Sequence, residues 1–198
     1  RLYVDWIWEL RGNGKGSVEA ASGWSGVMTL PRIFTLLNDG TLGIEPIPEI
    51  KILRMDCISR KDIVINSGDE INLSEMNGNC IELNISADIN KNTEFGIKVC
   101  CSPDCSEETI IIYDPKSRCL KIDCEKSSFN KNLEYNHYRY DPLQVSQWHN
   151  KSFTGEIPVN YRQTYQELPF ELAQNETLEL DIFLDKSVLE VDRKSTRL

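Results

Sequence analysis

The sequence has no hydrophobic run long enough to cross a membrane as a helix. A helical span needs about 18 consecutive apolar residues, whereas the longest apolar stretches of the 198-residue chain, at 4–8 and 109–113, have the length of a strand. Hydrophobic residues make up 40% and charged residues 27% of the chain, which also argues against a disordered protein. The sequence therefore predicts a folded protein with no membrane partner.

Positive charge is scarce in this chain. Lys and Arg number 22 against 31 Asp and Glu, which gives a net charge of -9, and no Lys/Arg stripe offsets it locally. Because such a chain repels phosphate backbones, we expect no nucleic-acid partner. Uncharged sugars are indifferent to net charge, so the composition leaves them open as ligands without pointing to them.

Motifs for nucleophilic or phosphate chemistry are missing. The only two histidines, His137 and His149, lie in a stretch without clear periodicity, and no Gly-X-Ser-X-Gly motif occurs, so we expect no nucleophilic triad. The glycine-rich loop at 12–16 lacks the Gly-Lys-Ser/Thr ending of a phosphate loop and is interpreted as a linker.

Paired acids are present, but spacing alone does not make them catalytic. Glu179 with Asp181, and Glu190 with Asp192, lie on the polar faces of expected strands. Solvation explains acids in such positions better than glycoside hydrolysis does.

The cysteines do not define a metal site. Cys101 and Cys105, with Cys119 and Cys124, could supply four thiolates to zinc, but no histidine lies near them, and buried single thiols are the better interpretation. We expect no metal and no cofactor. The seven cysteines are an odd number in a chain too long to need a disulfide framework. One or two disulfides are expected if the protein is secreted.

Asparagine sequons favour the secretory route. Each Asn-X-Ser/Thr triplet is a candidate glycan acceptor in an extracellular protein. Four occur, at Asn72, Asn84, Asn150 and Asn175. The expected location is therefore secreted or extracellular, whereas the oligomeric state has no signal in the sequence.

The periodicity that is present is that of strands. Residues 2–8 are β-branched and aromatic, and Asn-Asp-Gly at 38–40 favours a hairpin between the apolar stretches before and after it. Apolar and polar residues alternate at 80–87, 95–100 and 119–124, and a second hairpin is expected at 178–191. Many short alternating strands without helical periodicity favour a β-sandwich.

Two aromatic residues and one acid are the candidate binding residues. Trp6 and Trp8 share one strand face because residues two apart point the same way, and Glu9 follows them. Indole rings stack on sugar rings, and a carboxylate accepts hydrogen bonds from sugar hydroxyls, so these three residues could line a sugar pocket. Filling of a β core by both tryptophans remains an equal alternative.

The order of these segments resembles glycoside hydrolase family 32, the β-fructofuranosidases, which include invertases, inulinases and levanases. Asp5-Trp6-Ile7-Trp8-Glu9, the stretch Gly-Trp-Ser-Gly-Val-Met-Thr-Leu-Pro-Arg at 23–32, and Asp-Gly-Thr-Leu at 39–42 are similar to the family's last propeller blade. Residues 96–99, 108–114 and 182–191 are similar to its C-terminal sandwich. The resemblance implies an all-β protein in which residues 1–50 form the last blade of a five-bladed β-propeller, and residues 51–198 a C-terminal antiparallel β-sandwich with a loop-rich insertion at about 127–165.

The same resemblance implies that the catalytic residues lie outside this chain. The family carries its carboxylates in Asn-Asp-Pro-Asn-Gly, Arg-Asp-Pro and Glu-Cys motifs, and none of these occurs here. The chain begins within an expected strand, so we expect it to be the C-terminal part of a hydrolase that cleaves sucrose or fructans, with Trp6, Trp8 and Glu9 near the substrate and no catalytic residue of its own. A non-catalytic carbohydrate-binding or structural β-sandwich module is the alternative.

Overall fold

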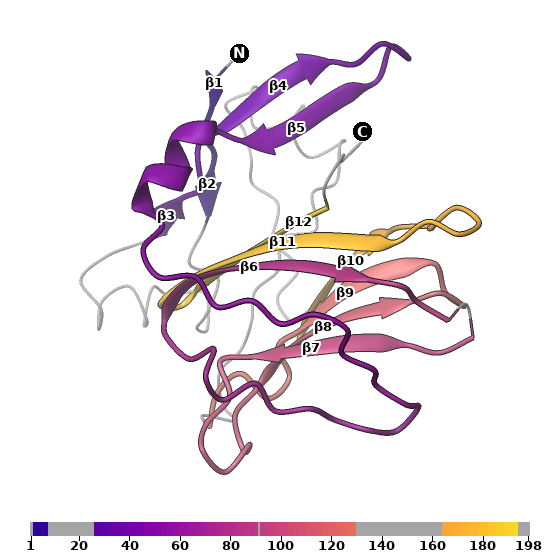
Figure 1. Cartoon of the computed structure of the whole chain (residues 1–198). Coiled ribbons are helices and arrows are strands. Elements are labelled where there is room, and N and C mark those ends of the chain that lie inside the picture. The colour runs from indigo at the N-terminus through magenta and orange to yellow at the C-terminus, as the bar shows by residue number, and fades with distance from the viewer. Residues whose placement is uncertain (1, 8–25, 91, 130–163, 194–198) are drawn as a thin grey trace, which may run out of the picture.

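The computed structural model describes residues 2–7, 26–90, 92–129 and 164–193 (Figure 1). Within these residues every strand pairing is antiparallel, and the strands form four sheets. The one helix in the described residues is a 3-10 helix, η1 (Pro48–Leu53). No helix in this part of the chain is long and apolar enough to span a membrane. The all-β prediction is confirmed.

The N-terminal part forms two small sheets. One has the order β1-β4-β5, from β1 (Leu2–Tyr3), β4 (Arg32–Leu36) and β5 (Leu42–Pro46). The other pairs β2 (Trp6–Ile7) with β3 (Val27–Met28). The hairpin expected around Asn38-Asp39-Gly40 is present, because the Asp39 carboxylate accepts hydrogen bonds from the amide and hydroxyl of Thr41.

The single strand expected at residues 2–8 is wrong for the part that the structure describes. The first strand ends at Tyr3, and β1 and β2 belong to different sheets. The Asp5 side chain accepts a hydrogen bond from the Trp6 amide at 2.7 Å, and the Asp5 amide donates to the Thr29 hydroxyl at 3.0 Å. The Asp5 carbonyl still accepts the Thr29 amide at 2.9 Å, but the Asp5 amide is bound to a side chain and not to a backbone carbonyl, so the regular ladder is interrupted here.

Two larger sheets form the sandwich that the alternating pattern predicts. The first has the order β10-β9-β8-β7 and the second the order β12-β11-β6. The strands of the first sheet are β7 (Phe95–Val99), β8 (Thr109–Asp114), β9 (Cys119–Asp123) and β10 (Tyr165–Pro169), and those of the second are β6 (Cys80–Ala87), β11 (Leu178–Asp185) and β12 (Val188–Arg193). Strand β10 was not predicted; all five of its residues are exposed, so it carries little periodic signal.

The core lies between these two sheets. Alternate residues of β8 and β11 point inward, including Ile111, Leu178, Leu180 and Ile182, which are all nearly inaccessible to solvent. Tyr113 and Phe170 close the cluster with ring centroids 5.2 Å apart in an edge-to-face arrangement. Because side chains alternate along a strand, the opposite face of sheet β12-β11-β6 is set by the residues between these core positions.

That opposite face, here called the acidic face, carries polar side chains in register. Asp181 of β11 lies between Asn84 of β6 and Asp192 of β12. In the next row the neighbours of Phe183 are Glu82 and Glu190. This face is the one that the N-terminal sheets reach.

The predicted division at residue 50 falls inside η1. The segment that follows, residues 54–79, has no helix or strand and runs in front of the sandwich in Figure 1. Most of the loop-rich insertion expected at about 127–165 lies outside the described residues.

Candidate functional site

Trp6 is the one predicted binding residue that the structure describes. It lies on β2, pairs with Met28 of β3 and is 46% exposed within the described part of the chain. Gly26 lies directly beneath the indole, where a Cβ atom would come within 2.3 Å of Trp6 Nε1. The other two predicted residues, Trp8 and Glu9, lie outside the described residues.

Tyr3 and Asp5 accompany Trp6, and the sequence reasoning missed both. The Tyr3 hydroxyl donates a hydrogen bond to Asp5 Oδ2 at 2.6 Å, and the Tyr3 ring packs against Phe34 with centroids 5.0 Å apart. The hydrogen bonds from Tyr3 and from the Trp6 amide hold the pKa of Asp5 below its usual value, so this carboxylate stays ionised. The spacing Tyr-X-Asp-Trp was the available signal for this arrangement.

These three residues can bind, but they do not form an acid/base pair. The exposed indole of Trp6 offers a flat apolar surface, and the ionised carboxylate of the preceding residue, Asp5, can accept hydrogen bonds from hydroxyl groups. A glycosidase also needs a second carboxyl group that holds a proton, and the described surroundings of Asp5 supply a phenol and one backbone amide instead. The arrangement therefore suits recognition of an uncharged polyhydroxyl ligand.

A charged junction joins the N-terminal sheets to the acidic face. The Arg32 guanidinium on β4 donates to Asp192 Oδ1 at 2.6 Å and to Glu190 Oε2 at 2.8 Å, both on β12. The other oxygen of Glu190 accepts the backbone amide of Leu30 at 2.8 Å. The exposed fractions of the Arg32, Glu190 and Asp192 side chains are 13%, 12% and 15%. The prediction that Glu190 and Asp192 are solvated is therefore wrong, because the packing of two sheets removes them from water.

At this junction, burial and ion pairing shift the pKa values of Asp192 and Arg32 in opposite directions. Burial raises the pKa of Asp192 above its usual value, although the hydrogen bond from Arg32 acts to lower it, and Asp192 Oδ2 is buried without a hydrogen-bond partner in the described structure. Burial acts to lower the pKa of Arg32, but the hydrogen bonds and charges of Asp192 and Glu190 outweigh it and raise that pKa. Both carboxylates hold the arginine, so neither is available as a catalytic acid or base.

A second arginine binds the same face from the segment after η1. Arg54 donates two hydrogen bonds to the Glu82 carboxylate on β6. Arg54 is 47% exposed, so this pair lies much nearer to solvent than the Arg32 junction. Of the other two acids predicted to be solvated, Glu179 is exposed, whereas Asp181 accepts a hydrogen bond from Asn84 at 2.8 Å.

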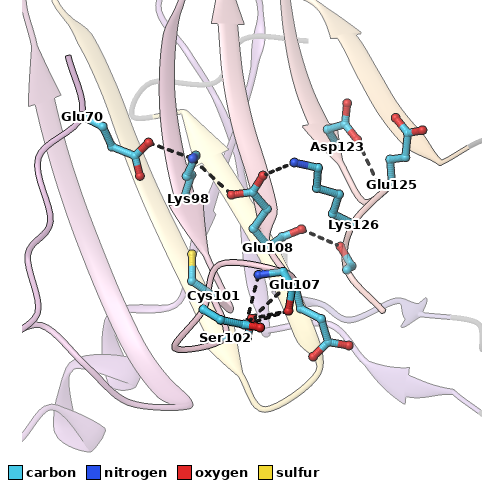
Figure 2. Close-up of polar contacts among 12 residues, drawn as sticks. Glu70, Lys98, Cys101, Ser102, Glu107, Glu108, Asp123, Glu125 and Lys126 are labelled. Carbon is cyan, nitrogen blue, oxygen red and sulfur yellow. Dashed lines mark hydrogen bonds and ion pairs between the residues drawn. The ribbon is translucent and has the colours of Figure 1, made fainter. Parts of the chain in front are cut away.

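A separate cluster of charges, shown in Figure 2, lies at one end of sheet β10-β9-β8-β7. The Glu108 carboxylate, 6% exposed, lies 3.2 Å from Lys98 Nζ and 3.0 Å from Lys126 Nζ, and Lys98 also reaches Glu70 at 2.8 Å. Hydrogen bonds from Lys126 and Lys98 lower the pKa of Glu108 against the effect of burial. Two ammonium groups thus hold Glu108 ionised, and Lys98 also ties Glu70 of the segment 54–79 to the sheet.

The cysteines provide neither a disulfide nor a metal site in the described structure. All seven are free, so the disulfides expected for a secreted form are not present. Cys101 and Cys105 flank a tight turn in which the Cys105 amide donates to the Ser102 carbonyl at 2.9 Å. Among the described residues, no group of three or more His, Cys, Asp or Glu side chains is placed to hold a metal ion.

Comparisons with known proteins match both parts of the chain. The sequence model described as "Glycosyl hydrolases family 32 C terminal" matches residues 49–191. A fructan 1-exohydrolase of Triticum urartu is 28% identical over 118 residues, which are 59% of this chain and 18% of that protein. The chain thus spans less than a fifth of that relative.

Two solved structures share the fold. The exo-inulinase of Aspergillus awamori superposes with a TM-score of 0.61 at 16% identity, over 98% of this chain and 33% of that one. The sucrose-6-phosphate hydrolase of Lactobacillus gasseri gives a TM-score of 0.60 at 19% identity, over 99% of this chain and 32% of that one. At these identities the likeness is one of fold, and it covers the N-terminal sheets as well as the sandwich.

Proposed function

This chain belongs to glycosyl hydrolase family 32, whose C-terminal domain it contains at residues 49–191, and we propose that it is the C-terminal part of an enzyme that cleaves fructosyl linkages in sucrose or fructans. The family match carries this proposal. The relative named above is a fructan 1-exohydrolase, and the chain covers only a small share of it. The activity therefore belongs to a larger protein of which this chain is one portion.

The N-terminal sheets fit the last blade of a propeller. Their exposed surface includes Leu2, Met28 and Leu36, large apolar side chains that neighbouring blades would cover. The fold likeness to the exo-inulinase extends through this part of the chain, which is consistent with the same assignment. The division into residues 1–50 and 51–198 follows from this proposal.

In the proposed enzyme the catalytic carboxylates come from earlier blades. One carboxyl group protonates the glycosidic oxygen while another attacks the anomeric C2 of fructose, and water then releases the covalent fructosyl-enzyme. The present chain contributes Trp6, with Trp8 and Glu9, to one wall of the pocket. Asp5 and Tyr3 extend that wall, because the ionised Asp5 can accept hydrogen bonds from sugar hydroxyls. The sequons favour an extracellular location for the whole protein.

The test begins with the coding sequence upstream of Arg1. The proposal expects an open reading frame with the aspartate and glutamate motifs named above, and release of fructose when the complete protein is incubated with sucrose, inulin or levan. Absence of those motifs together with absence of fructose release would refute the proposal and favour a non-catalytic sugar-binding or structural module.

The role of Trp6 is tested separately within the complete enzyme. We expect Trp6→Ala to raise KM about tenfold at most, because a stacked aromatic contact contributes about 0.5–1.5 kcal/mol. Tryptophan fluorescence of the unmodified enzyme should change when fructose is added. Leu168→Ala, which truncates an exposed apolar side chain on β10 in a different sheet, is the control and should leave KM unchanged. An unchanged KM in Trp6→Ala, together with a fructose-induced fluorescence change as large as that of the unmodified enzyme, would remove this residue from the pocket.

A further inference from the structure

Three of the four sequons lie within the described residues, and the fold places them in different surroundings. Asn72 is in the irregular segment 54–79, Asn84 is in the middle of β6, and Asn175 is in the turn that leads into β11. An N-linked glycan is large and hydrophilic, so the folded protein must leave its acceptor side chain open to solvent. The structure therefore discriminates among acceptors that the sequence treats alike.

Asn175 is presented at the tip of a tight turn. The turn is closed by the Glu176 amide, which donates to the Ala173 carbonyl at 3.2 Å, and by the Ala173 amide, which donates to Glu176 Oε2 at 2.7 Å. Asn175 has a φ of 62°, a conformation that Asn tolerates well among residues other than Gly. In Figure 1 this turn projects beyond the end of the sheets, on the side away from η1.

The acceptor atom of Asn175 is free for modification. The residue is exposed, and its side-chain amide makes no hydrogen bond with the described part of the chain. The sequon threonine, Thr177, donates its hydroxyl to Asp88 Oδ1 at 2.8 Å, which holds the start of β11 against the end of β6. A glycan on Asn175 would therefore extend into solvent without breaking any of the contacts that fix the turn.

Asn84 is also exposed, but hydrogen bonds engage its side chain. Its Nδ2 atom, to which a glycan would be attached, donates to Asp181 Oδ1 at 2.8 Å and to Glu82 Oε1 at 3.2 Å. It lies in the same row as Asp192, which holds Arg32 of the N-terminal sheets. A glycan at this position would remove a donor from the acidic face and occupy the side of the sheet on which those sheets dock.

We propose that Asn175 is the site of an N-linked glycan in this protein and that Asn84 is not. The donor is a lipid-pyrophosphate-linked oligosaccharide, used by the membrane oligosaccharyl transferase of a eukaryotic secretory pathway. The bond from Nδ2 of Asn175 to the anomeric carbon forms, the bond from that carbon to the pyrophosphate breaks, and the amide proton is released with the lipid pyrophosphate. This inference rests on the secretory location proposed above, but it does not depend on the hydrolase activity.

The experiment expresses the complete protein behind an efficient secretory leader in a eukaryotic cell, so that its natural location is not a variable. Treatment with an N-glycanase converts each modified Asn to Asp, which peptide mass spectrometry identifies. We expect conversion at Asn175 and none at Asn84. Asn175→Gly should abolish the Asn175 glycan and its mobility shift while the turn is kept, because Gly also adopts positive φ, and Thr177→Ser should retain the glycan because the sequon survives.

Two results would overturn the inference. One is secreted, folded protein in which Asn175 remains unmodified. The other is a glycan on Asn84 of the secreted, folded protein, because it would show that the acidic face accommodates a sugar. Secretion of the protein with its own leader is measured in parallel, which separates failure of the proposed location from failure of the acceptor assignment.

Discussion

Substitution of Arg32, which lies outside the sandwich core, should strongly weaken the attachment of the N-terminal sheets to the sandwich. Arg32→Met in the complete protein keeps most of the length and the apolar stem of the side chain but removes the charge. It leaves Glu190 and Asp192, which are 12% and 15% exposed, without their shared cation. Because solvent cannot fully rehydrate these carboxylates while the sheets stay docked, the substitution should weaken the attachment of the N-terminal sheets to β12.

The magnitude follows from the degree of burial. Removing one partner of a buried ion pair costs about 3–5 kcal/mol, and the residual exposure of these three side chains places the loss near the lower end, at about 3 kcal/mol. A loss of that size corresponds to about a 100-fold increase in the population of the separated state. Arg54 is 47% exposed, so Arg54→Met should cost only about 0.5 kcal/mol by losing its contact with Glu82.

Amide hydrogen exchange measures this directly. The Leu30 amide donates to Glu190, and its exchange should therefore report separation of the junction. We expect about 100-fold faster exchange at Leu30 in Arg32→Met, little change in Arg54→Met, and recovery of most of the protection when Glu190→Gln and Asp192→Asn are added to Arg32→Met. Unchanged exchange in Arg32→Met, or a triple variant that is no better protected, would refute the reasoning.

Three further predictions concern the core, the pH dependence and the aromatic site. Ile182→Ala should lower the free energy of unfolding by about 2–5 kcal/mol because Ile182 is completely buried, whereas Leu168→Ala on the exposed side of β10 should change it little; equal losses in urea titrations would contradict this. The pKa of Asp192 is raised above 3.8 in the folded state, so the folded state binds the Asp192 proton more tightly than the unfolded state does. The stability that this protonation contributes is lost as the pH rises through the folded pKa. The unmodified protein should therefore gain stability relative to Asp192→Asn as the pH is lowered towards 3.8, and a difference that is constant with pH would contradict the assignment. Gly26→Ala should displace the Trp6 indole, because a Cβ atom would lie 2.3 Å from Nε1 and the φ of 70° disfavours Ala, so an unchanged fluorescence spectrum would show that the ring is not held there.

The sandwich could be predicted well because its signal is local. In β11 the residues Leu178, Leu180 and Ile182 are buried, while Glu179 between them is exposed, as the alternation in the sequence predicts. Similar alternation located most of the strands of both sheets. The exception is β10, whose exposed residues carry no apolar face and which is defined only by its pairing with β9.

The candidate site could be predicted only in part. The sequence pointed to Trp6, whose side chain is half-exposed within the described part of the chain. It did not indicate that the strand ends before Asp5 or that the Asp5 carboxylate accepts hydrogen bonds from Tyr3 and Trp6, because such bonds depend on backbone conformation and not on residue period.

The sequence by itself determined the fold class, the positions of most sandwich strands and the absence of the family's catalytic motifs, because each of these is written in neighbouring residues. Tertiary structure alone decided the fate of Glu190 and Asp192. In the sequence they look like solvated acids on a polar strand face. In the structure both bind Arg32, which lies 160 residues before Asp192 in the chain. The physical reason is that the cost of burying a charge depends on what the fold brings against it, and that partner has no fixed spacing along the chain.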